Sequence, residues 1–151
     1  MEETLRPRVR VAGIIIENNK ILLIEHLKKN KKYWLVPGGG VDWGESTAEA
    51  LIREYKEETN LDITVEKFLF LSETIAPDKK KHVINLYFQI KIIKNSIYNM
   101  KLGDERNLTD LKFITKEEIE NIKLYPNIKT QLIQLLNEEK IAPYLGLLWD
   151  K

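Results

Sequence analysis

The chain has 151 residues, 43% hydrophobic and 31% charged, a composition and length that suit one domain over residues 1–151. Its net charge of +1 favours no general attraction to nucleic acid or to an anionic membrane. The chain contains no cysteine, which excludes disulfides, thiolate nucleophiles and thiolate zinc sites. No apolar run approaches the ~20 residues of a membrane span, and the first ten residues lack the apolar core of a signal peptide. We therefore expect a cytoplasmic protein.

The first part of the chain predicts a β-hairpin followed by a glycine-rich loop. Residues 9–17 and 20–27 are rich in β-branched and aliphatic side chains, and Asn18-Asn19 between them tolerates the positive φ of a tight turn. A short apolar segment follows at 33–36. It leads into Pro37-Gly38-Gly39-Gly40, whose residue types are typical of a loop.

Residues 46–59 predict a helix. Ser46 and Glu49 have the spacing of a capping box, and neither Gly nor Pro interrupts the segment that follows. Asn60 is expected to end this helix, because Asn tolerates the left-handed conformation just beyond a helix C-terminus.

The middle of the chain predicts further strands. Residues 63–74 and 82–93 are strongly β-prone, and a lysine-rich loop containing Pro77 joins them. A polar loop over 95–107 then precedes a short strand at 108–114.

The last third predicts helices and an apolar tail. Thr115 and Glu118 offer a second capping box, which indicates a brief helix. Pro126 suits the first turn of another helix that ends near Lys140, since the apolar residues between them lie near helical spacing. The tail at 141–151 is too apolar to be left in solvent, so it should pack on its own domain or on a partner.

Three glutamates gather on one side of the helix predicted at 46–59. At about 100° per residue, Glu54, Glu57 and Glu58 lie opposite the apolar side. Like charges at these spacings destabilise a helix by roughly 0.2–0.5 kcal/mol per pair, so a bound divalent cation is one reason to keep them together. A solvated acidic surface is the other interpretation, and the three residues alone leave both open.

The surrounding residues complete a longer motif, G-x5-E-x7-R-E-x-x-E-E. Residues 39–61, GGVDWGESTAEALIREYKEETNL, resemble the Nudix box of the Nudix hydrolases. The chain departs from the family pattern at Tyr55, where a small aliphatic residue is usual, and at Asn60, where Gly is usual. The resemblance implies an α/β fold, namely an α/β/α sandwich with a mixed β-sheet, and a single domain that spans the chain.

The resemblance also implies a metal site. In that family the helix carboxylates bind Mg²⁺ or Mn²⁺, and water attacks a phosphorus of a nucleoside diphosphate linked to another group. By position, the metal ligands would be Glu54, Glu57, Glu58 and the backbone carbonyl of Gly38. Gly39, in the same turn, is expected to let the backbone approach the substrate closely.

Three further residues receive catalytic roles from the resemblance. Arg53 would hold the carboxylates in place by ion pairing, a task that suits its planar fork. Glu45 could support the loop through Arg53, help to bind a metal, or complement the positive helix N-terminus. The general base varies within the family, so Glu105 in the later polar loop is the first candidate and Glu54 the alternative.

Substrate choice is less clearly marked. Pro77 lies 16 residues after Leu61, near the position of a proline typical of the ADP-ribose pyrophosphatase branch, although ordinary turn chemistry explains it as well. Tyr33 and Trp34 could stack on a base or belong to the core. The two histidines, His26 and His82, are expected to be structural or surface residues, and the lysine run at 79–81 to be solvated.

The expected activity is metal-dependent hydrolysis of ADP-ribose or a similar nucleotide sugar. The alternatives are a MutT-like pyrophosphatase for canonical or oxidised nucleoside triphosphates, a dinucleoside polyphosphate hydrolase, and a nucleotide sensor that does not hydrolyse its ligand. Nucleic acid is not an expected partner, because no basic stripe with interleaved aromatic residues is visible in the sequence. The apolar tail around Leu147 and Trp149 could form a homodimer or cover the core of its own chain.

Overall fold

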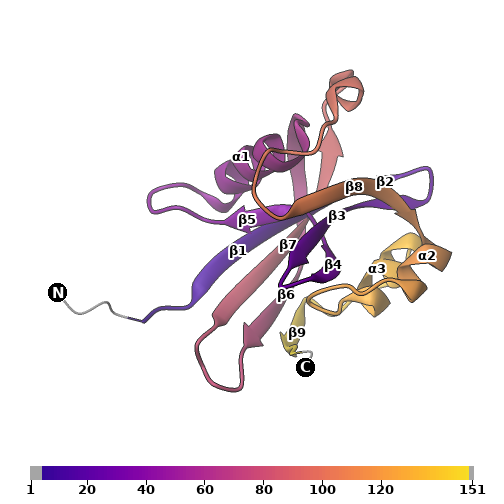
Figure 1. Cartoon of the computed structure of the whole chain (residues 1–151). Coiled ribbons are helices and arrows are strands. Elements are labelled where there is room, and N and C mark those ends of the chain that lie inside the picture. Colours follow the sequence, from indigo (N-terminus) through magenta and orange to yellow (C-terminus); the bar gives the residue numbers. More distant parts are fainter. Residues whose placement is uncertain (1–4, 150–151) are drawn as a thin grey trace.

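The computed structural model describes residues 5–149, and its elements form two β-sheets with helices on both sides (Figure 1). In chain order the elements are β1 (Arg8–Ile14), β2 (Ile16–Glu17), β3 (Lys20–Lys28), β4 (Lys31–Leu35), β5 (Gly38–Gly40), α1 (Thr47–Thr59), β6 (Ile63–Ile75), β7 (His82–Ile92), the 3₁₀ helix η1 (Ser96–Asn99), β8 (Leu108–Thr115), α2 (Lys116–Asn121), α3 (Lys129–Leu136) and β9 (Tyr144–Leu147).

The larger sheet is mixed and has the strand order β5-β1-β7-β6-β9. In it β1 runs parallel to β7 and β6 runs parallel to β9, whereas the other neighbours are antiparallel. The smaller sheet is antiparallel, with β3 paired to β8 on one edge and to β2 and β4 on the other.

The hairpin predicted over 9–17 and 20–27 is only partly right. The two-residue strand β2 does pair with β3 across Asn18-Asn19, both of which have positive φ. However, β1 lies in the larger sheet between β5 and β7. The chain passes from the larger to the smaller sheet at Ile15. Both sides of this segment are buried: Val11 and Ile15 face one hydrophobic core, and Ala12 and Ile14 face the other.

The glycine-rich segment is a strand, not the loop predicted from its residue types. Gly38 to Gly40 form β5, which pairs with Ala12 to Arg10 of β1. A Cβ atom at Gly38 would collide with the backbone carbonyl of Val11. The glycines therefore serve here to bring two backbones together rather than to make a turn.

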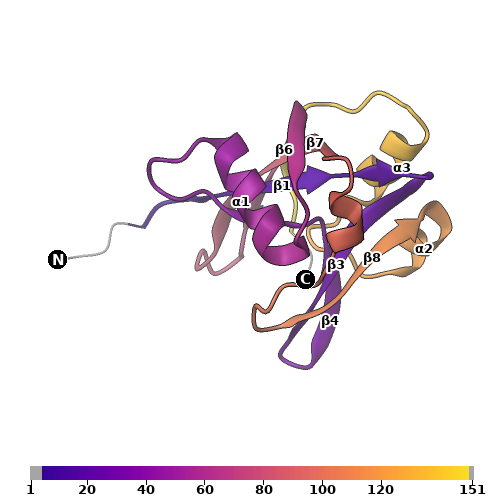
Figure 2. The same cartoon turned by 90° about the horizontal axis from the view of Figure 1, so that it is seen from above.

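Helix α1 confirms the prediction for residues 46–59. Ser46 and Glu49 form the expected capping box, and Asn60 follows the helix in the left-handed conformation with φ 58°. Buried Leu51 and Tyr55 pack into the same core as Val11 and Ile15. The core on the other side of the larger sheet includes residues of α2 and α3, and two views at right angles show α1 on the opposite side of the sheets from these helices (Figure 2). The mixed sheet with helices on both faces confirms the expected α/β fold.

The end of the chain differs in detail from the prediction. The capping box of Thr115 and Glu118 begins α2 as expected. Pro126 does not lie in a helix, because Trp34 of β4 donates its N–H to the carbonyl of Lys123 and accepts from the N–H of Tyr125, which ties this segment to the sheet. The next helix, α3, begins only at Lys129 and ends at Leu136, before the predicted end near Lys140.

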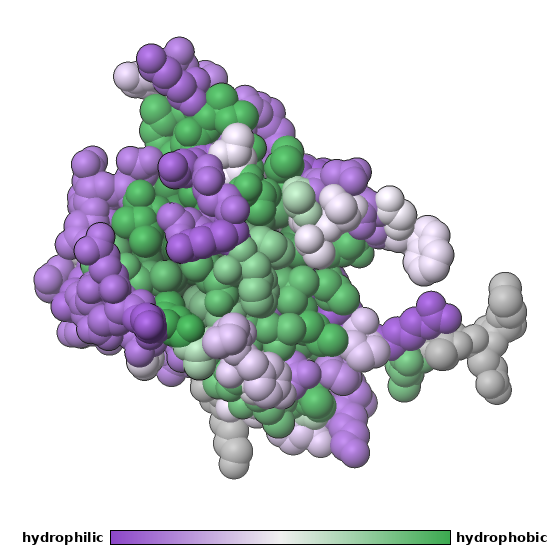
Figure 3. Space-filling view, turned by 180° about the vertical axis from the view of Figure 1, so that it is seen from behind, coloured by the Kyte–Doolittle hydropathy of each residue, from purple (hydrophilic) through white to green (hydrophobic). Residues whose placement is uncertain are grey.

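The apolar tail packs on its own domain. In it β9 extends the larger sheet beside β6, and Leu145 and Leu148 contact the core that includes α2 and α3. Residues 150 and 151 of the predicted tail lie outside the described residues. Seen from behind, a broad hydrophobic area occupies the middle of the molecule, and hydrophilic residues lie around it (Figure 3). Every helix in residues 5–149 is too short or too polar to cross a membrane.

Candidate metal centre and adjoining cavity

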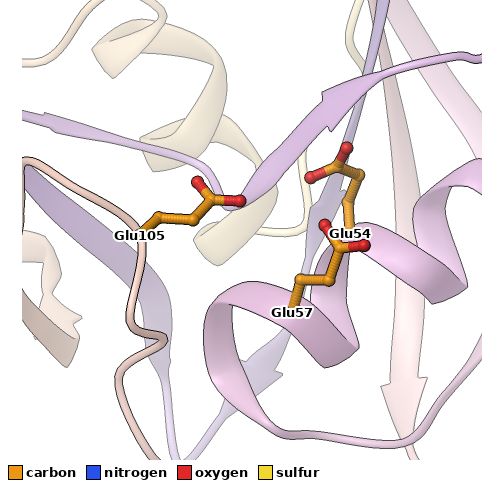
Figure 4. A group of neighbouring side chains, drawn as sticks. All are labelled: Glu54, Glu57 and Glu105. Carbon is orange, nitrogen blue, oxygen red and sulfur yellow. The ribbon is translucent and has the colours of Figure 1, made fainter.

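Three carboxylates converge at the site. Glu54 and Glu57 project from α1, and Glu105 reaches toward them from the loop between η1 and β8 (Figure 4). Each residue offers one carboxylate oxygen, and these oxygens lie within 4.8 Å of one another. Oxygen-rich sites of this kind suit hard divalent cations such as Mg²⁺, which one or two carboxylates plus substrate phosphates commonly hold.

Arg53 contacts two of these carboxylates, since it forms an ion pair with Glu57, Nη1 to Oε1 3.5 Å, and hydrogen-bonds to Glu54. Its Nη1 donates to Glu54 Oε1 at 2.8 Å, while Nε and Nη2 donate to the two carboxylate oxygens of Glu45 at 3.1 and 2.6 Å. Nη2 also donates to the carbonyl of Gly40 at 3.0 Å. Glu45 is thus linked through Arg53 to the Gly40 carbonyl, a contact that fits the first of the three roles considered for it, and the hydrogen bond from Arg53 lowers the pKa of Glu45.

The structure brings Glu58 to the site but not into the group of three carboxylates. Its side chain is buried, and Oε1 accepts the backbone N–H of Gly38 at 2.8 Å. Burial raises the pKa of Glu58 to about 7, although Arg10 and the hydrogen bond from Gly38 oppose the shift. Glu58 and Gly38, both expected to bind metal, are therefore joined by a hydrogen bond from the N–H of Gly38 to the Glu58 carboxylate.

The absence of a side chain at Gly39 leaves room for Glu54. A Cβ atom at this position would lie on the Glu54 carboxylate. Burial raises the pKa of Glu54, and the hydrogen bond from Arg53 counteracts that rise. Gly39 therefore leaves space for the Glu54 carboxylate, and Arg53 holds this carboxylate in place by a hydrogen bond.

The loop that carries Glu105 is attached to the C-terminal end of α1. The N–H groups of Lys101 and Gly103 donate to the carbonyls of Thr59 and Glu58 at 2.9 and 2.8 Å, so they satisfy helix carbonyls that lack partners within the helix. A Cβ atom at Gly103 would collide with the carbonyl of Glu57. This close approach helps to place Glu105 beside Glu57.

A cavity of about 310 Å³ adjoins the carboxylates. It is lined by Arg8, Arg10, His26, Tyr33, Leu35, Gly38, Gly39, Gly40, Glu54, Glu58, Thr74, Lys81, Val83, Asn85, Glu105, Tyr125 and Pro126. Tyr33 thus lies where a substrate-binding residue is expected. Trp34 does not, because its side chain points to the core that includes α2 and α3.

Several cavity residues were missed by sequence reasoning. His26 was expected to be structural or on the surface, yet it lines the cavity with Nε2 4.0 Å from Glu58 Oε2, and burial lowers its pKa. Lys81, expected to be solvated, also lines the cavity. Arg10 donates to the carbonyl of Val36 at 2.8 Å. Its only signal in the sequence was the scarcity of arginine, which makes up 5 of the 24 basic residues.

The comparisons with known proteins agree with this geometry. A family model for the NUDIX domain matches residues 6–136. The chain is 36% identical over 126 residues to an ADP-ribose pyrophosphatase of Methanocaldococcus jannaschii, a match that covers 80% of this chain and 72% of the relative. It is 34% identical over 74 residues to the phosphatase NudJ of Escherichia coli, about half of each chain.

A solved structure supports the fold. The crystal structure of a NUDIX hydrolase from Nitrosomonas europaea matches with a TM-score of 0.75 and 19% identity, covering 97% of this chain and 81% of that one. The chain therefore belongs to the NUDIX family. It is a Nudix hydrolase, which confirms the interpretation of residues 39–61 as a Nudix box.

Proposed function

We propose that this Nudix hydrolase cleaves the diphosphate of ADP-ribose or a similar nucleotide sugar and uses Mg²⁺ or Mn²⁺. The observation that carries the proposal is the convergence of Glu54, Glu57 and Glu105 at the edge of a cavity whose other walls carry cationic side chains. The named activity of the archaeal relative and the position of Pro77 favour ADP-ribose within this class.

The side chains divide the work of binding and proton transfer. Glu54, Glu57 and Glu58, with the carbonyl of Gly38, would hold the metal, which when bound screens phosphate charge and activates water. Arg53 keeps Glu54 in its place. Arg10 and Lys81 line the cavity where they attract the diphosphate, and Tyr33 offers a ring for the base.

Glu105 is the proposed general base. It is exposed, it faces Glu54 and Glu57, and it lies on a separate loop, so it can accept a proton without being the principal metal ligand. Water adds its oxygen to one phosphorus, the bridging P–O bond breaks, and ADP-ribose yields AMP and ribose 5-phosphate. The lack of cysteine and the nucleotide substrate favour the cytoplasm as the place of action.

The test is a substrate panel. Purified protein would be incubated with Mg²⁺ or Mn²⁺ and with ADP-ribose, other nucleotide sugars, dinucleoside polyphosphates, or canonical and oxidised nucleoside triphosphates, and every product would be resolved. A chelator and the variant Glu57→Gln, which removes a ligand charge at constant shape, are the controls. Metal-dependent release of AMP plus ribose 5-phosphate from ADP-ribose supports the proposal. Pyrophosphate released preferentially from a triphosphate contradicts it, and binding without any metal-dependent product would indicate a sensor.

A further inference from the structure

A second compartment opens beside the cavity. It has a volume of about 320 Å³ and shares Tyr33, Lys81 and Tyr125 with the lining of the cavity. The rest of its lining comes from the turn between β3 and β4, from the segment before α3 and from the end of the chain: Lys28, Lys29, Lys31, Lys123 and Trp149. The two spaces therefore adjoin, and the compartment lies on the far side of the shared residues from the metal centre.

Aromatic rings line this compartment in a row. The ring centroids of Tyr33 and Tyr125 are 6.0 Å apart, and those of Tyr125 and Trp149 are 6.2 Å apart, both in edge-to-face geometry. The ammonium of Lys81 lies 4.7 Å from the centroid of the Tyr125 ring. Flat aromatic surfaces next to cations are the combination on which nucleotides stack and bind.

Among residues 5–149, no carboxylate balances the positive charge in the lining of the compartment. Five of the eight lining residues are lysines. The lysines of residues 5–149 that form ion pairs are Lys32, Lys56 and Lys112, none of which belongs to the compartment. Burial, together with repulsion from Lys28, Arg10 and Arg8, lowers the pKa of Lys81. A bound anion would relieve this repulsion.

ADP-ribose does not supply that anion. Its diphosphate must lie at the metal centre to be cleaved, and neither its adenosine nor its terminal ribose carries further charge. We propose that the compartment binds an additional phosphate on the nucleotide, with a base held against Tyr125 and Trp149 and the phosphate among the surrounding lysines. This inference rests on the proposed function and refines its substrate: a substrate with a phosphate beyond the cleaved diphosphate would be preferred to ADP-ribose, which would still be cleaved.

The extra phosphate could come from two kinds of substrate. It is a ribose phosphate in ADP-ribose 2′-phosphate, and it belongs to the second nucleotide in diadenosine tetraphosphate. Comparing kcat/KM for both with kcat/KM for ADP-ribose tests the proposal, because ADP-ribose and its 2′-phosphate differ by one phosphate alone. We expect kcat/KM for the preferred phosphate-rich substrate to exceed kcat/KM for ADP-ribose by about tenfold or more, because lysines form charge-assisted hydrogen bonds with phosphate.

The matched variants carry the same net charge. Lys28→Gln with Lys123→Gln removes two lysines of the compartment, whereas Lys67→Gln with Lys91→Gln removes two exposed lysines of the larger sheet. The first pair should lower the preference for the phosphate-rich substrate about tenfold, mainly through KM, and the control pair should retain it. Equal kcat/KM for all three substrates in the parent, or an unchanged preference in the first pair, overturns the proposal.

Binding separates this inference from the proposed function. Calorimetry in the presence of a chelator measures the dissociation constants of ADP-ribose and ADP-ribose 2′-phosphate without turnover. A ratio of dissociation constants that favours the 2′-phosphate and is lost in the first pair supports the compartment, even if neither compound is hydrolysed. Normal hydrolysis of ADP-ribose with equal dissociation constants overturns the compartment and leaves the proposed function standing.

Discussion

Arg53 distributes its hydrogen bonds over Glu45, Glu54 and the Gly40 carbonyl. A lysine has no planar fork and could not make these contacts together. The spacing of Glu54 and Glu57 on one helix face was predictable, because it follows from helical periodicity alone. The burial of Glu58 was not, because it depends on β5, which lies against α1 and whose Gly38 donates to this carboxylate.

Replacing Glu105 tests the general base. Glu105→Gln keeps the shape of the side chain but cannot accept a proton, so kcat should fall about 10²- to 10⁴-fold while the affinity for Mn²⁺ changes much less. Steady-state kinetics and a metal titration of the same preparation would measure both. An unchanged kcat would assign the role to Glu54 or to another acid, and a parallel loss of metal affinity would make Glu105 a ligand.

Gly39 tests how narrowly Glu54 is placed. Gly39→Ala puts a methyl group where the Glu54 carboxylate lies, and Arg53 keeps that carboxylate from moving aside, so kcat should fall by about 10²-fold with the fold intact. Gly40→Ala is the matched control, since its methyl group would meet only the flexible end of Arg8. Comparable losses of kcat in the two variants, measured beside their circular dichroism, would contradict this account.

Local elements were predicted well and distant pairings were not. Helix α1 begins and ends as expected because its capping box and the left-handed Asn60 are determined by neighbours in the sequence. The sheet partners of β1 are β5 and β7, the latter more than 60 positions away in the chain, so hairpin reasoning chose the wrong strand. The strand at Gly38 to Gly40 was missed because its residue types favour loops, whereas close packing on β1 determines its structure.

Tyr55 joins α1 to the larger sheet. Its hydroxyl is buried and donates to the carbonyl of Gly13 at 2.6 Å. Tyr55→Phe leaves this carbonyl without its partner, so the free energy of unfolding should fall by about 1–3 kcal/mol. Urea denaturation measures the change. The control is Tyr98→Phe, at a side chain that is 86% exposed, and its free energy of unfolding should lie within about 0.5 kcal/mol of that of the parent. Equal effects of the two substitutions would refute the role of the Tyr55 contact.

The start of α2 predicts a pH dependence of stability. The hydrogen bond from the Thr115 N–H, with Lys112 and the Thr115 hydroxyl, lowers the pKa of Glu118, so the ionised carboxylate stabilises the folded state. That contribution is present above the unfolded pKa of about 4.3 and is lost as the pH falls through the folded value. Glu118→Gln should therefore be less stable than the parent at neutral pH, and the difference should shrink in acid. The urea midpoints of the parent and of Glu118→Gln would be measured at neutral pH and in acid. An equal difference between the two proteins at both pH values would contradict this prediction.

At the scale of the whole molecule, β9 is an edge strand of the larger sheet, and no other strand of residues 5–149 pairs with its outer side. Leu147 is 58% exposed on this strand, and the molecule carries a broad hydrophobic area (Figure 3). Because exposed edge strands pair with other chains, we propose that a second copy binds here. Light scattering should report a dimer for the parent and a monomer for Leu147→Asp, whereas Leu5→Asp, at another exposed leucine, should stay dimeric. A monomeric parent would rule this contact out.

The basic and aromatic compartment could not have been predicted from the sequence. Its lysines and rings come from residues 28–33, 81, 123–125 and 149, and nothing in the sequence indicates that these separate segments meet. The Nudix box was visible because its residues lie within one stretch of 23, from 39 to 61. The chemistry of cleavage is therefore local in the chain, whereas the walls that would select the substrate are assembled only by the fold.

The attachment of the Glu105 loop to α1 has a dynamic consequence. Two backbone amides, those of Lys101 and Gly103, hold the loop to the last helical turn, so an opening of the whole loop would release both hydrogen bonds. The rate of deuterium uptake at the amides of Lys101 and Gly103 would thus report how often the loop detaches from α1. If deuterium uptake at the two amides is slow compared with turnover, the loop stays closed during catalysis. The nucleotide would then enter and leave on the side of the compartment lysines, and not at the acidic end of the cavity.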